Sequence, residues 1–330
     1  MYQRQRGINS VVKLGLYFLC ALCVLCGGES FSAPYPSKTI RIIVPYPAGA
    51  FNDQFGRALA QHLNKAWGKP TVVENRPGGS TIIATDLVAK SPPDGHTLLI
   101  ASFATAVNVS LFSKLPFDTL HDLAPVIFAA QTANVLVANT AFPAASIKEL
   151  IALAKAKPDQ INYASGGNGS STHLAMEMLK RMAGIGLTHV PYKGSAPALT
   201  DLMGAQVSIA LDNIPNVLPH VKAGKLRALG ISSAKRSGTL PEVPSIAESV
   251  PGFDVSVWFG VMVPAGTPTP IVAQLNAEIN RMLASKDIQA RFNAQGVETV
   301  GGPPEKLASH LRSEIELWGK LVKSAGITPE

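Results

Sequence analysis

Cysteine is scarce in this 330-residue chain, and all three cysteines, Cys20, Cys23 and Cys26, stand near its beginning. The rest of the sequence therefore offers no disulfide, no thiol nucleophile and no thiolate metal site. The seven histidines do not compensate, because they show no HExxH or comparable ligand spacing. We expect neither a metal nor a cofactor.

Long apolar runs are absent too. The longest, Leu14 to Cys26, has about a dozen residues, short of the roughly 20 that a membrane helix needs. Basic residues precede it and small residues follow, as in a secretory signal peptide. We expect residues 1–32 to be that peptide, directing a soluble protein to the periplasm. A lipid anchor at Cys26 is the alternative, although the residues before it lack the small side chain expected there.

Charged residues make up 15% of the chain and aromatic residues 6%, and the net charge is +7. The positive balance weakly favours acidic partners, but no run of five or more basic residues occurs, so a nucleic-acid groove is not expected. Hydrophobic residues make up 46%, enough to bury a sizeable core. At this length, two lobes are the natural expectation.

Short β-branched runs alternate with amphipathic ones, which predicts an α/β fold with a mainly parallel sheet in each lobe. Strands are predicted at 38–46, 70–75, 95–102, 161–165, 187–192, 207–213 and 226–233, and helices at 52–68, 85–92, 146–156, 172–184, 195–205 and 218–225. Two further helices, 268–285 and 304–326, end the chain.

Two apolar extended segments, 135–139 and 255–268, are the predicted crossings between lobes. They divide the chain into lobe 1, residues 33–137 with 259–330, and lobe 2, residues 138–258. Trp258 is expected to pack near the second crossing. A chain that crosses twice leaves a cleft between lobes, where small ligands often bind.

The segment "IIVPYPAGAFND" predicts a strand, a turn at Gly49 and the start of a helix that Asn52 or Asp53 can cap. Backbone amides from Gly49 to Phe51 could face a ligand carboxylate. An ordinary strand-to-helix loop explains the segment equally well.

The segment "YASGGNGSSTHLAME" has the same layout, with glycines for backbone approach and hydroxyls near a helix N-terminus. It lacks the GxxxxGK[ST] order of a phosphate loop, and no GxGxxG or G-x-S-x-G occurs. An exported serine hydrolase using Ser170 or Ser171 with His173 is the alternative function. His173 is expected instead to cap or pack the helix.

Two further segments contain candidate ligand residues. In "VPYKG", Tyr192 and Lys193 end a strand, and Lys193 could face an anion or solvent. Asp212, at the end of "SIALDN", could cap a loop or meet a ligand ammonium or hydroxyl group.

The chain closely resembles the Bug family from about Tyr35 to the C-terminus. The motifs that carry the resemblance are the two loops above and the segments "VVENRPGG", "PPDGHTLL", "HVPYKGSAPALTDLMGAQVSIALDN" and "WFGVMVPAGTP". These TctC-type proteins are extracytoplasmic receptors of tripartite tricarboxylate transporters. The resemblance implies a two-lobe, flytrap-like periplasmic binding protein of type II and no enzyme. It also implies a small carboxylate ligand held by main-chain amides and ordered waters, with membrane permease subunits or a sensor kinase as partner. We expect a monomer.

Carried over residue by residue, the resemblance points to one set of ligand-binding residues. They are Gly49, Ala50 and Asp53 in the first loop, Ser165, Gly166, Gly169, Ser170 and Thr172 in the second loop, and Tyr192, Lys193 and Asp212. We add Phe51 and Ser102 to this predicted ligand-binding set. The chain departs from the family at Phe51, which adds an aromatic ring to a loop that is usually small. Ser80 and Thr81 also stand where glycines are usual. Phe51 is therefore expected to influence which acid fits.

Overall fold

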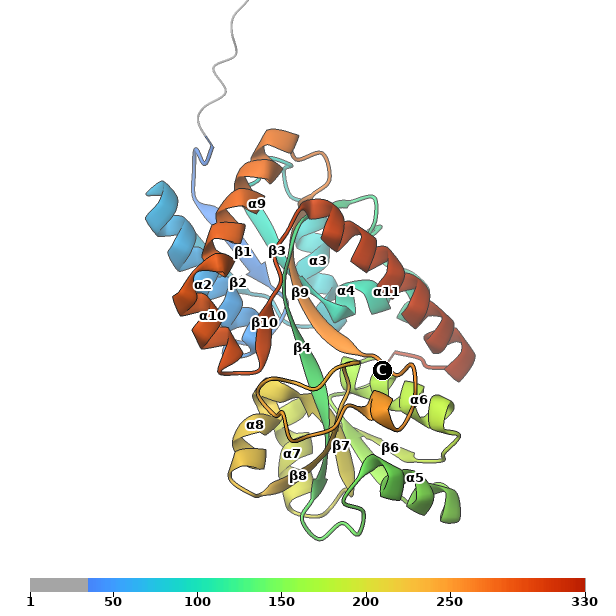
Figure 1. The fold of residues 1–330 in the computed structure, drawn as a ribbon. Coiled ribbons are helices and arrows are strands. Elements are labelled where there is room, and N and C mark those ends of the chain that lie inside the picture. Colours follow the sequence, from blue (N-terminus) through green and yellow to red (C-terminus); the bar gives the residue numbers. More distant parts are fainter. Residues whose placement is uncertain (1–34, 330) are drawn as a thin grey trace, which may run out of the picture. The chain divides into compact units, whose positions relative to one another are not determined.

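The computed structural model describes residues 35–329, so the predicted signal peptide at 1–32 lies outside the described residues. Residues Lys38–Glu330 form one compact unit, to which all the elements below belong (Figure 1). None of the helices in the described residues is long and apolar enough to cross a membrane.

Sheet 1 contains six strands in the order β2-β1-β3-β9-β4-β10. Three of them, β1 (Ile40–Val44), β2 (Thr71–Asn75) and β3 (Thr97–Ser102), are parallel. The other three, β9 (Ser256–Pro264), β4 (Leu123–Asn139) and β10 (Val297–Thr299), pair antiparallel.

Sheet 2 has the order β6-β5-β7-β4-β8. Here β5 (Asn162–Ser165) pairs in parallel with β6 (Thr188–Pro191) and β7 (Ile209–Asn213). The end of β4 pairs antiparallel with β7 and with β8 (Leu226–Ile231).

Strand β4 belongs to both sheets. It pairs with β9 up to Ala133 and with β7 from Asn134 onward. The chain returns from sheet 2 to sheet 1 where β9 begins at Ser256. We call each sheet with its helices a half of the molecule. The segments predicted as crossings lie at or beside these two positions, and the exact lobe boundaries stay a prediction.

Helices cover both sheets (Figure 1). The first half contains α2 (Phe51–Trp67), η1 (Gly79–Thr81), α3 (Ile82–Ala89), α4 (Phe103–Leu111), α9 (Thr269–Ala284), α10 (Lys286–Asn293) and α11 (Pro304–Ala325). The second half contains α5 (Ile147–Ala156), α6 (Ser171–Ala183), α7 (Ser195–Met203), α8 (Ile214–Lys222) and η2 (Ile246–Glu248).

The alternation of side chains along β4 explains how sheet 2 is covered. Ala133, Val135 and Val137 point to one face and pack in a buried cluster with residues of α7 and α8. Leu136 and Ala138, on the other face, are also completely buried. Since both faces are covered, the strand is apolar nearly throughout and does not alternate with polar residues.

The predicted α/β class is confirmed, and the structure shows that both sheets are mixed because β4 and β9 run against their neighbours. Trp258 packs as expected, with no exposed surface and its Nε1 donating to Glu314 Oε2 at 3.2 Å. Helices α4 and α10 were not predicted. The α4 sequence "FATAVNVSL" contains no charge to mark a solvent face, because β3 and α11 pack against it.

Candidate functional site

The carboxyl ends of β3 in sheet 1 and β7 in sheet 2 lie level with nearby positions of β4. In sheet 1, Ser102 at the end of β3 pairs with Phe259, which pairs with Ala130 of β4. In sheet 2, Asn213 at the end of β7 pairs with Asn134. Four residues of strand span about 13 Å. The loops that follow these strand ends, where open α/β sheets bind ligands, therefore lie close to the crossing between halves.

The first loop, between β1 and α2, is braced by Asp53. The Asp53 Oδ2 atom accepts hydrogen bonds from Gly49 N and Arg57 Nε, both at 3.0 Å, and Oδ1 accepts one from Asn75 Nδ2 at 3.0 Å. Asn75 Nδ2 also donates to Tyr46 O. Burial favours the uncharged form of Asp53, but these hydrogen bonds outweigh it and hold its pKa below the usual value.

This geometry changes what two of the predicted residues do. The Asp53 residue is 3% exposed and its carboxylate is bonded within the protein, so it braces the loop. The Phe51 ring is 8% exposed and lies 4.6 Å from the Phe259 ring and 5.0 Å from the Phe292 ring. Its bulk therefore lies mostly in the core of its own half, and an influence of Phe51 on which acid fits stays a prediction.

Backbone amides remain available in this loop. Helix α2 begins after Ala50 with no side-chain cap, and the first N–H groups of a helix have no acceptor inside it. Gly49 has a φ of +92°, a conformation that glycine adopts without strain. The loop therefore presents the positive end of α2.

Ser102 supports the same loop from β3. Its Oγ is hydrogen-bonded to the Tyr46 hydroxyl at 2.8 Å, and its backbone N–H donates to Thr105 Oγ1 at 3.2 Å. Ser102 is 3% exposed. Tyr46 and Asn75, which sequence reasoning missed, thus connect β1, β2 and β3 at their carboxyl ends.

A strained turn lies beside α4. Ser80 and Thr81 have φ values of +50° and +79°, unusual for residues with a side chain. Asn108 of α4 holds the turn by donating to Ser80 O at 2.6 Å and to Thr81 Oγ1 at 3.2 Å. Strain of this kind persists only where the surroundings enforce it, so Asn108 is a supporting residue that sequence reasoning also missed.

In the second loop, the hydroxyl groups predicted as ligand donors hold the loop itself. Thr172 Oγ1 accepts from Gly166 N at 2.9 Å, and Ser170 Oγ caps α6 by accepting from His173 N at 3.2 Å. Ser165 Oγ accepts from Gly167 N at 3.1 Å. As in the first loop, side chains fix the conformation of the backbone.

His173 packs the helix, as predicted. Its ring is 6% exposed, and its Nδ1 accepts from Gly169 N at 3.1 Å. Ser170 is bonded to the backbone of His173 and to Thr172, and Nδ1 of His173 faces Gly169. This is not the arrangement of a base that activates Ser170.

The third loop, after β6, touches the second. Tyr192 N donates to Ser165 O at 3.1 Å, while the Tyr192 hydroxyl donates to Asp201 Oδ2 at 2.7 Å. Lys193 is exposed to solvent. Asp212 Oδ1 accepts from Ser195 Oγ and Asn216 Nδ2, and burial raises the pKa of this carboxyl. Asp212 thus joins β7, α7 and α8 beside the site.

The two halves touch at the second loop. Gly169 has a φ of +72°, and a Cβ placed on it would lie 2.3 Å from Leu111 Cδ2 at the end of α4. Leu111 and Asn108 are three residues apart and so share one face of α4. Helix α4 therefore brings the turn at Ser80 and Thr81 near the loop at Gly169.

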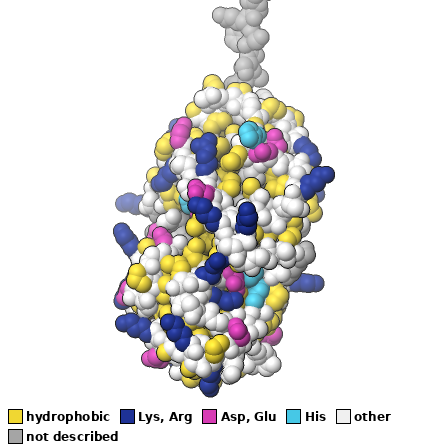
Figure 2. All heavy atoms as spheres, turned by 90° about the vertical axis from the view of Figure 1, so that its right-hand side faces the viewer, with side chains coloured by type: hydrophobic (Ala, Val, Ile, Leu, Met, Phe, Trp, Pro, Cys, Tyr) yellow, Lys and Arg dark blue, Asp and Glu magenta, His cyan; other side chains and the backbone are white. Residues whose placement is uncertain are grey.

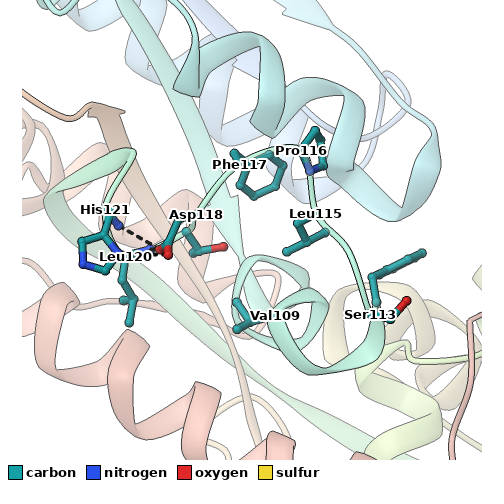
Figure 3. Close-up of a pocket in the computed structure, with 10 residues that line it drawn as sticks. Val109, Ser113, Leu115, Pro116, Phe117, Asp118, Leu120 and His121 are labelled. Carbon is teal, nitrogen blue, oxygen red and sulfur yellow. Dashed lines mark hydrogen bonds and ion pairs between the residues drawn. The ribbon is translucent and has the colours of Figure 1, made fainter.

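A surface hollow elsewhere is a weaker candidate. It follows α4 and is lined by Val109, Phe112, Ser113 and residues 115–121, with an ion pair between His121 and Asp118 (Figure 3). No strand ends there, and His121 is largely exposed. On the face drawn in Figure 2, Lys and Arg side chains are interspersed with other types and form no continuous patch. Within residues 35–329, no three His, Cys, Asp or Glu side chains are grouped to hold a metal.

Comparisons with known proteins agree with this geometry. A family model described as "Tripartite tricarboxylate transporter family receptor" matches residues 55–327. The chain is similar to an R. palustris protein solved with adipate, at 37% identity and a TM-score of 0.82, covering 90% of this chain and 100% of that one. It is similar to the periplasmic binding protein BugD, at 33% identity and a TM-score of 0.79, covering 90% and 100%. MatC from Rhodopseudomonas palustris with bound malate matches at 32% identity and a TM-score of 0.77, covering 87% and 100%.

Proposed function

The chain belongs to the tripartite tricarboxylate transporter receptor family, and from that premise we propose that it is an extracytoplasmic receptor that captures a small organic carboxylate. The family is one of substrate-binding receptors and not of enzymes. The exported hydrolase gains no support from the relatives or from the contacts of Ser170. We propose that the protein has no catalytic activity of its own.

The observation that carries the proposal is the pairing of two amide-rich loops at the carboxyl edges of the two sheets. The first loop presents the uncapped start of α2, and the second precedes α6. Helix N-termini attract anions through their free N–H groups and the helix dipole. The nearby Asp53 is compensated by Arg57, so it does not oppose an anion strongly.

Magnitudes agree with such a site. A hydrogen bond to a charged group contributes about 1.5 to 3 kcal/mol, and micromolar affinity needs about 8 kcal/mol. Three or four amide donors from two loops therefore suffice, even after the cost of association. We retain the predicted set with a division of roles. The N–H groups of Ala50 and Phe51, at the uncapped start of α2, meet the ligand. The N–H groups of Gly49, Gly166 and Gly169 are bonded to Asp53, Thr172 and His173, so these glycines shape the loops. The side chains of Asp53, Ser102, Ser165, Ser170 and Thr172 hold the loops in place, and Tyr192, Lys193 and Asp212 lie beside the second loop.

Closure is proposed to occur between lobe 1, residues 33–137 with 259–330, and lobe 2, residues 138–258. The chain passes between the sheets at Ala133/Asn134 and before Ser256, so two extended segments can act as hinges. A ligand that contacts both lobes only when they are closed shifts the population toward the closed form. The closed monomer would then be presented to membrane permease subunits or a sensor kinase, after export by the signal peptide at 1–32.

A thermal-shift screen followed by calorimetry tests the function. Adipate, malate, citrate, glutamate and benzoate are compared with adipamide, which keeps the length of adipate but has no charge. We expect at least one acid to raise the midpoint of unfolding in a concentration-dependent way, since a ligand stabilises the state it binds, and adipamide to have no effect. The carboxylate proposal is wrong if none of the acids acts, or if adipamide acts as well as adipate does.

A further inference from the structure

We propose that His173 and His189 are positioning residues that act as one unit: their stacked rings hold the loop from Ser165 to Ser170 in the conformation that binds the carboxylate. This inference rests on the proposed function, because it assigns that loop to the ligand. It adds a role for His189, which lies on β6 and in none of the predicted ligand segments.

The two rings are bonded to the loop at both of its ends. Gly169 N donates to His173 Nδ1 at 3.1 Å, close to the start of α6. At the strand end, His189 Nε2 and Ser165 Oγ are hydrogen-bonded at 2.6 Å. Ser165 Oγ in turn accepts from Gly167 N at 3.1 Å. The orientation of two loop amides therefore depends, directly or through one hydroxyl, on the imidazoles.

The rings also fix each other. Those of His173 and His189 are stacked with centroids 3.9 Å apart and planes at 7°. The Tyr163 ring stacks on the other side of His189, at 4.9 Å and 20°. Tyr163 is completely buried, and its hydroxyl donates to Glu177 Oε1 at 2.7 Å. A column of three rings joins β5, β6 and α6, so neither imidazole can rotate without disturbing its neighbours.

The geometry requires a neutral His173. A backbone N–H can donate to Nδ1 only when that nitrogen carries no proton, so the ring proton must be on Nε2. Burial, and to a lesser extent the neighbouring His189 and Lys180, lower the pKa of His173 to about 4 against the opposing effect of Glu177. Above that pH the ring accepts from Gly169, and below it protonation removes the acceptor.

Other charged groups near α6 are engaged elsewhere. Lys180 Nζ pairs with Glu177 Oε1 at 2.7 Å. On β7, the Asp212 carboxylate faces Ser195 and Asn216. Helix α11 reaches α6 through Ser324, which is hydrogen-bonded to Arg181. His189 and Glu177, with Lys180, are therefore the charged groups that act on the His173 ring.

The sign of the pH effect follows. Between about pH 6.5 and pH 4 the unfolded chain binds a proton at His173 that the folded protein does not. The stability linked to the neutral ring is therefore complete above this window and is lost as the pH falls through it. The loop should lose its Gly169 hydrogen bond near the lower end of the same window.

Matched variants separate positioning from bulk. H173N keeps an acceptor near the position of Nδ1 but cannot be protonated in this range, whereas H173L removes the acceptor. H189Q and H189L form the same pair at Ser165. H121N changes an exposed histidine in the hollow of Figure 3 and serves as the control.

The test uses adipate, with malate in parallel, and calorimetry near neutral pH. Losing a hydrogen bond that holds the loop in its binding conformation should weaken affinity about tenfold in H173L and H189L, the value of about one hydrogen bond from the loop to a charged ligand. The affinities of H173N, H189Q and H121N for adipate should remain within about twofold of the wild-type affinity. Such a difference is small compared with the tenfold change expected from the loss of one hydrogen bond. A second readout needs no ligand: in ¹⁵N NMR of the free protein, the Gly169 amide signal should follow the titration of His173 and become independent of pH in H173N.

The inference is overturned if folded H173L binds adipate like the wild type, or if the Gly169 amide does not follow His173. If H173L does not fold, the Gly169 amide signal of the wild type and of H173N, measured as a function of pH, still tests the inference. If neither adipate nor malate binds the wild type while the Gly169 amide follows His173, the ligand assignment fails and the positioning of the loop stands.

Discussion

Around the candidate site, side chains hold the loops in place and the backbone of the loops supplies the N–H groups proposed to bind the ligand. Asp53, Thr172 and Ser170 carry the polar groups that first suggest ligand contact, yet each is hydrogen-bonded to the backbone of its own loop. The groups proposed to bind an anion are other amides of these loops, whose positions depend on these side chains. Residue types in the sequence predicted where the loops are, but they did not reveal which atoms face the ligand.

The Ala50 amide provides a direct test at this scale. Ala50 has a φ of −63°, close to the value fixed by proline, and the N-caps of α9 and α11 are already prolines, Pro268 and Pro303. A50P removes one N–H without changing this angle. If that N–H binds the carboxylate, affinity for adipate should fall about tenfold, the value of one hydrogen bond to a charge.

A50G is the matched control for calorimetry, because it keeps the N–H and adds no side chain that could cap α2. Both variants should unfold near the wild-type midpoint. Equal affinity of A50P and A50G for adipate would remove Ala50 from the site.

Helices α11 and α4 both lie beside the candidate site, but sequence patterns predicted only the first of them. The final helix was predicted at 304–326 and occupies Pro304–Ala325, since its apolar stripe and proline start are local signals. Helix α4 was missed although it touches both the turn at Ser80 and the loop at Gly169. Its role depends on contacts with residues that are 28 and 58 positions away in the sequence, and no local pattern reveals such contacts.

Strand β4 contains two buried asparagines whose replacement by leucine should change the free energy of unfolding in opposite directions. Asn134, where β4 changes sheets, is completely buried, and its Nδ2 and Oδ1 have no hydrogen-bond partner among the described residues. Asn139 Oδ1 accepts from Ala141 N, and its Nδ2 donates to Val207 O. N134L should raise the free energy of unfolding by about 1 kcal/mol, because it removes a buried amide that gains nothing in return.

N139L should lower the free energy of unfolding by about 1 to 3 kcal/mol, because it leaves two backbone groups unpaired. Urea denaturation measures both variants. Destabilisation of N134L to the same extent as N139L would mean that a bound water or ligand group satisfies Asn134.

At the scale of the whole molecule, several contacts join the halves on both sides of β4. Gly169 lies against Leu111, and a Cβ on Gly296 would lie 2.2 Å from Ile214 Cγ2. Thr239 Oγ1 donates to Asn293 O at 3.2 Å. Since these contacts connect different halves, we expect them to affect the closure proposed above.

Gly169 and Gly184 form a matched pair for testing this contact. Both have positive φ, +72° and +61°, but a Cβ on Gly184 would meet nothing within 4 Å. G184A should therefore cost only the left-handed strain, about 1 to 2 kcal/mol. G169A adds the clash with Leu111, about 1 to 3 kcal/mol more, and should also weaken adipate binding by holding the halves apart.

Thermal unfolding and calorimetry measure both effects. The double variant L111A/G169A should recover part of the affinity for adipate, because it removes the atom that the new methyl group meets. If G169A and G184A behave alike, the contact does not limit closure.

The sequence by itself determined the α/β class, most of the strands and helices, the positions of the loops and the family resemblance, because these depend on local periodicity and on short ordered motifs. Only the tertiary structure decided that β4 belongs to both sheets and that Asn75, Asn108 and His189 are hydrogen-bonded to the loops beside the crossing. It also placed the Phe51 ring in the core. The physical reason is that period-two patterning says which face of a strand is buried but not which strand lies beside it, and contacts between distant residues exist only once the chain has crossed between its two halves.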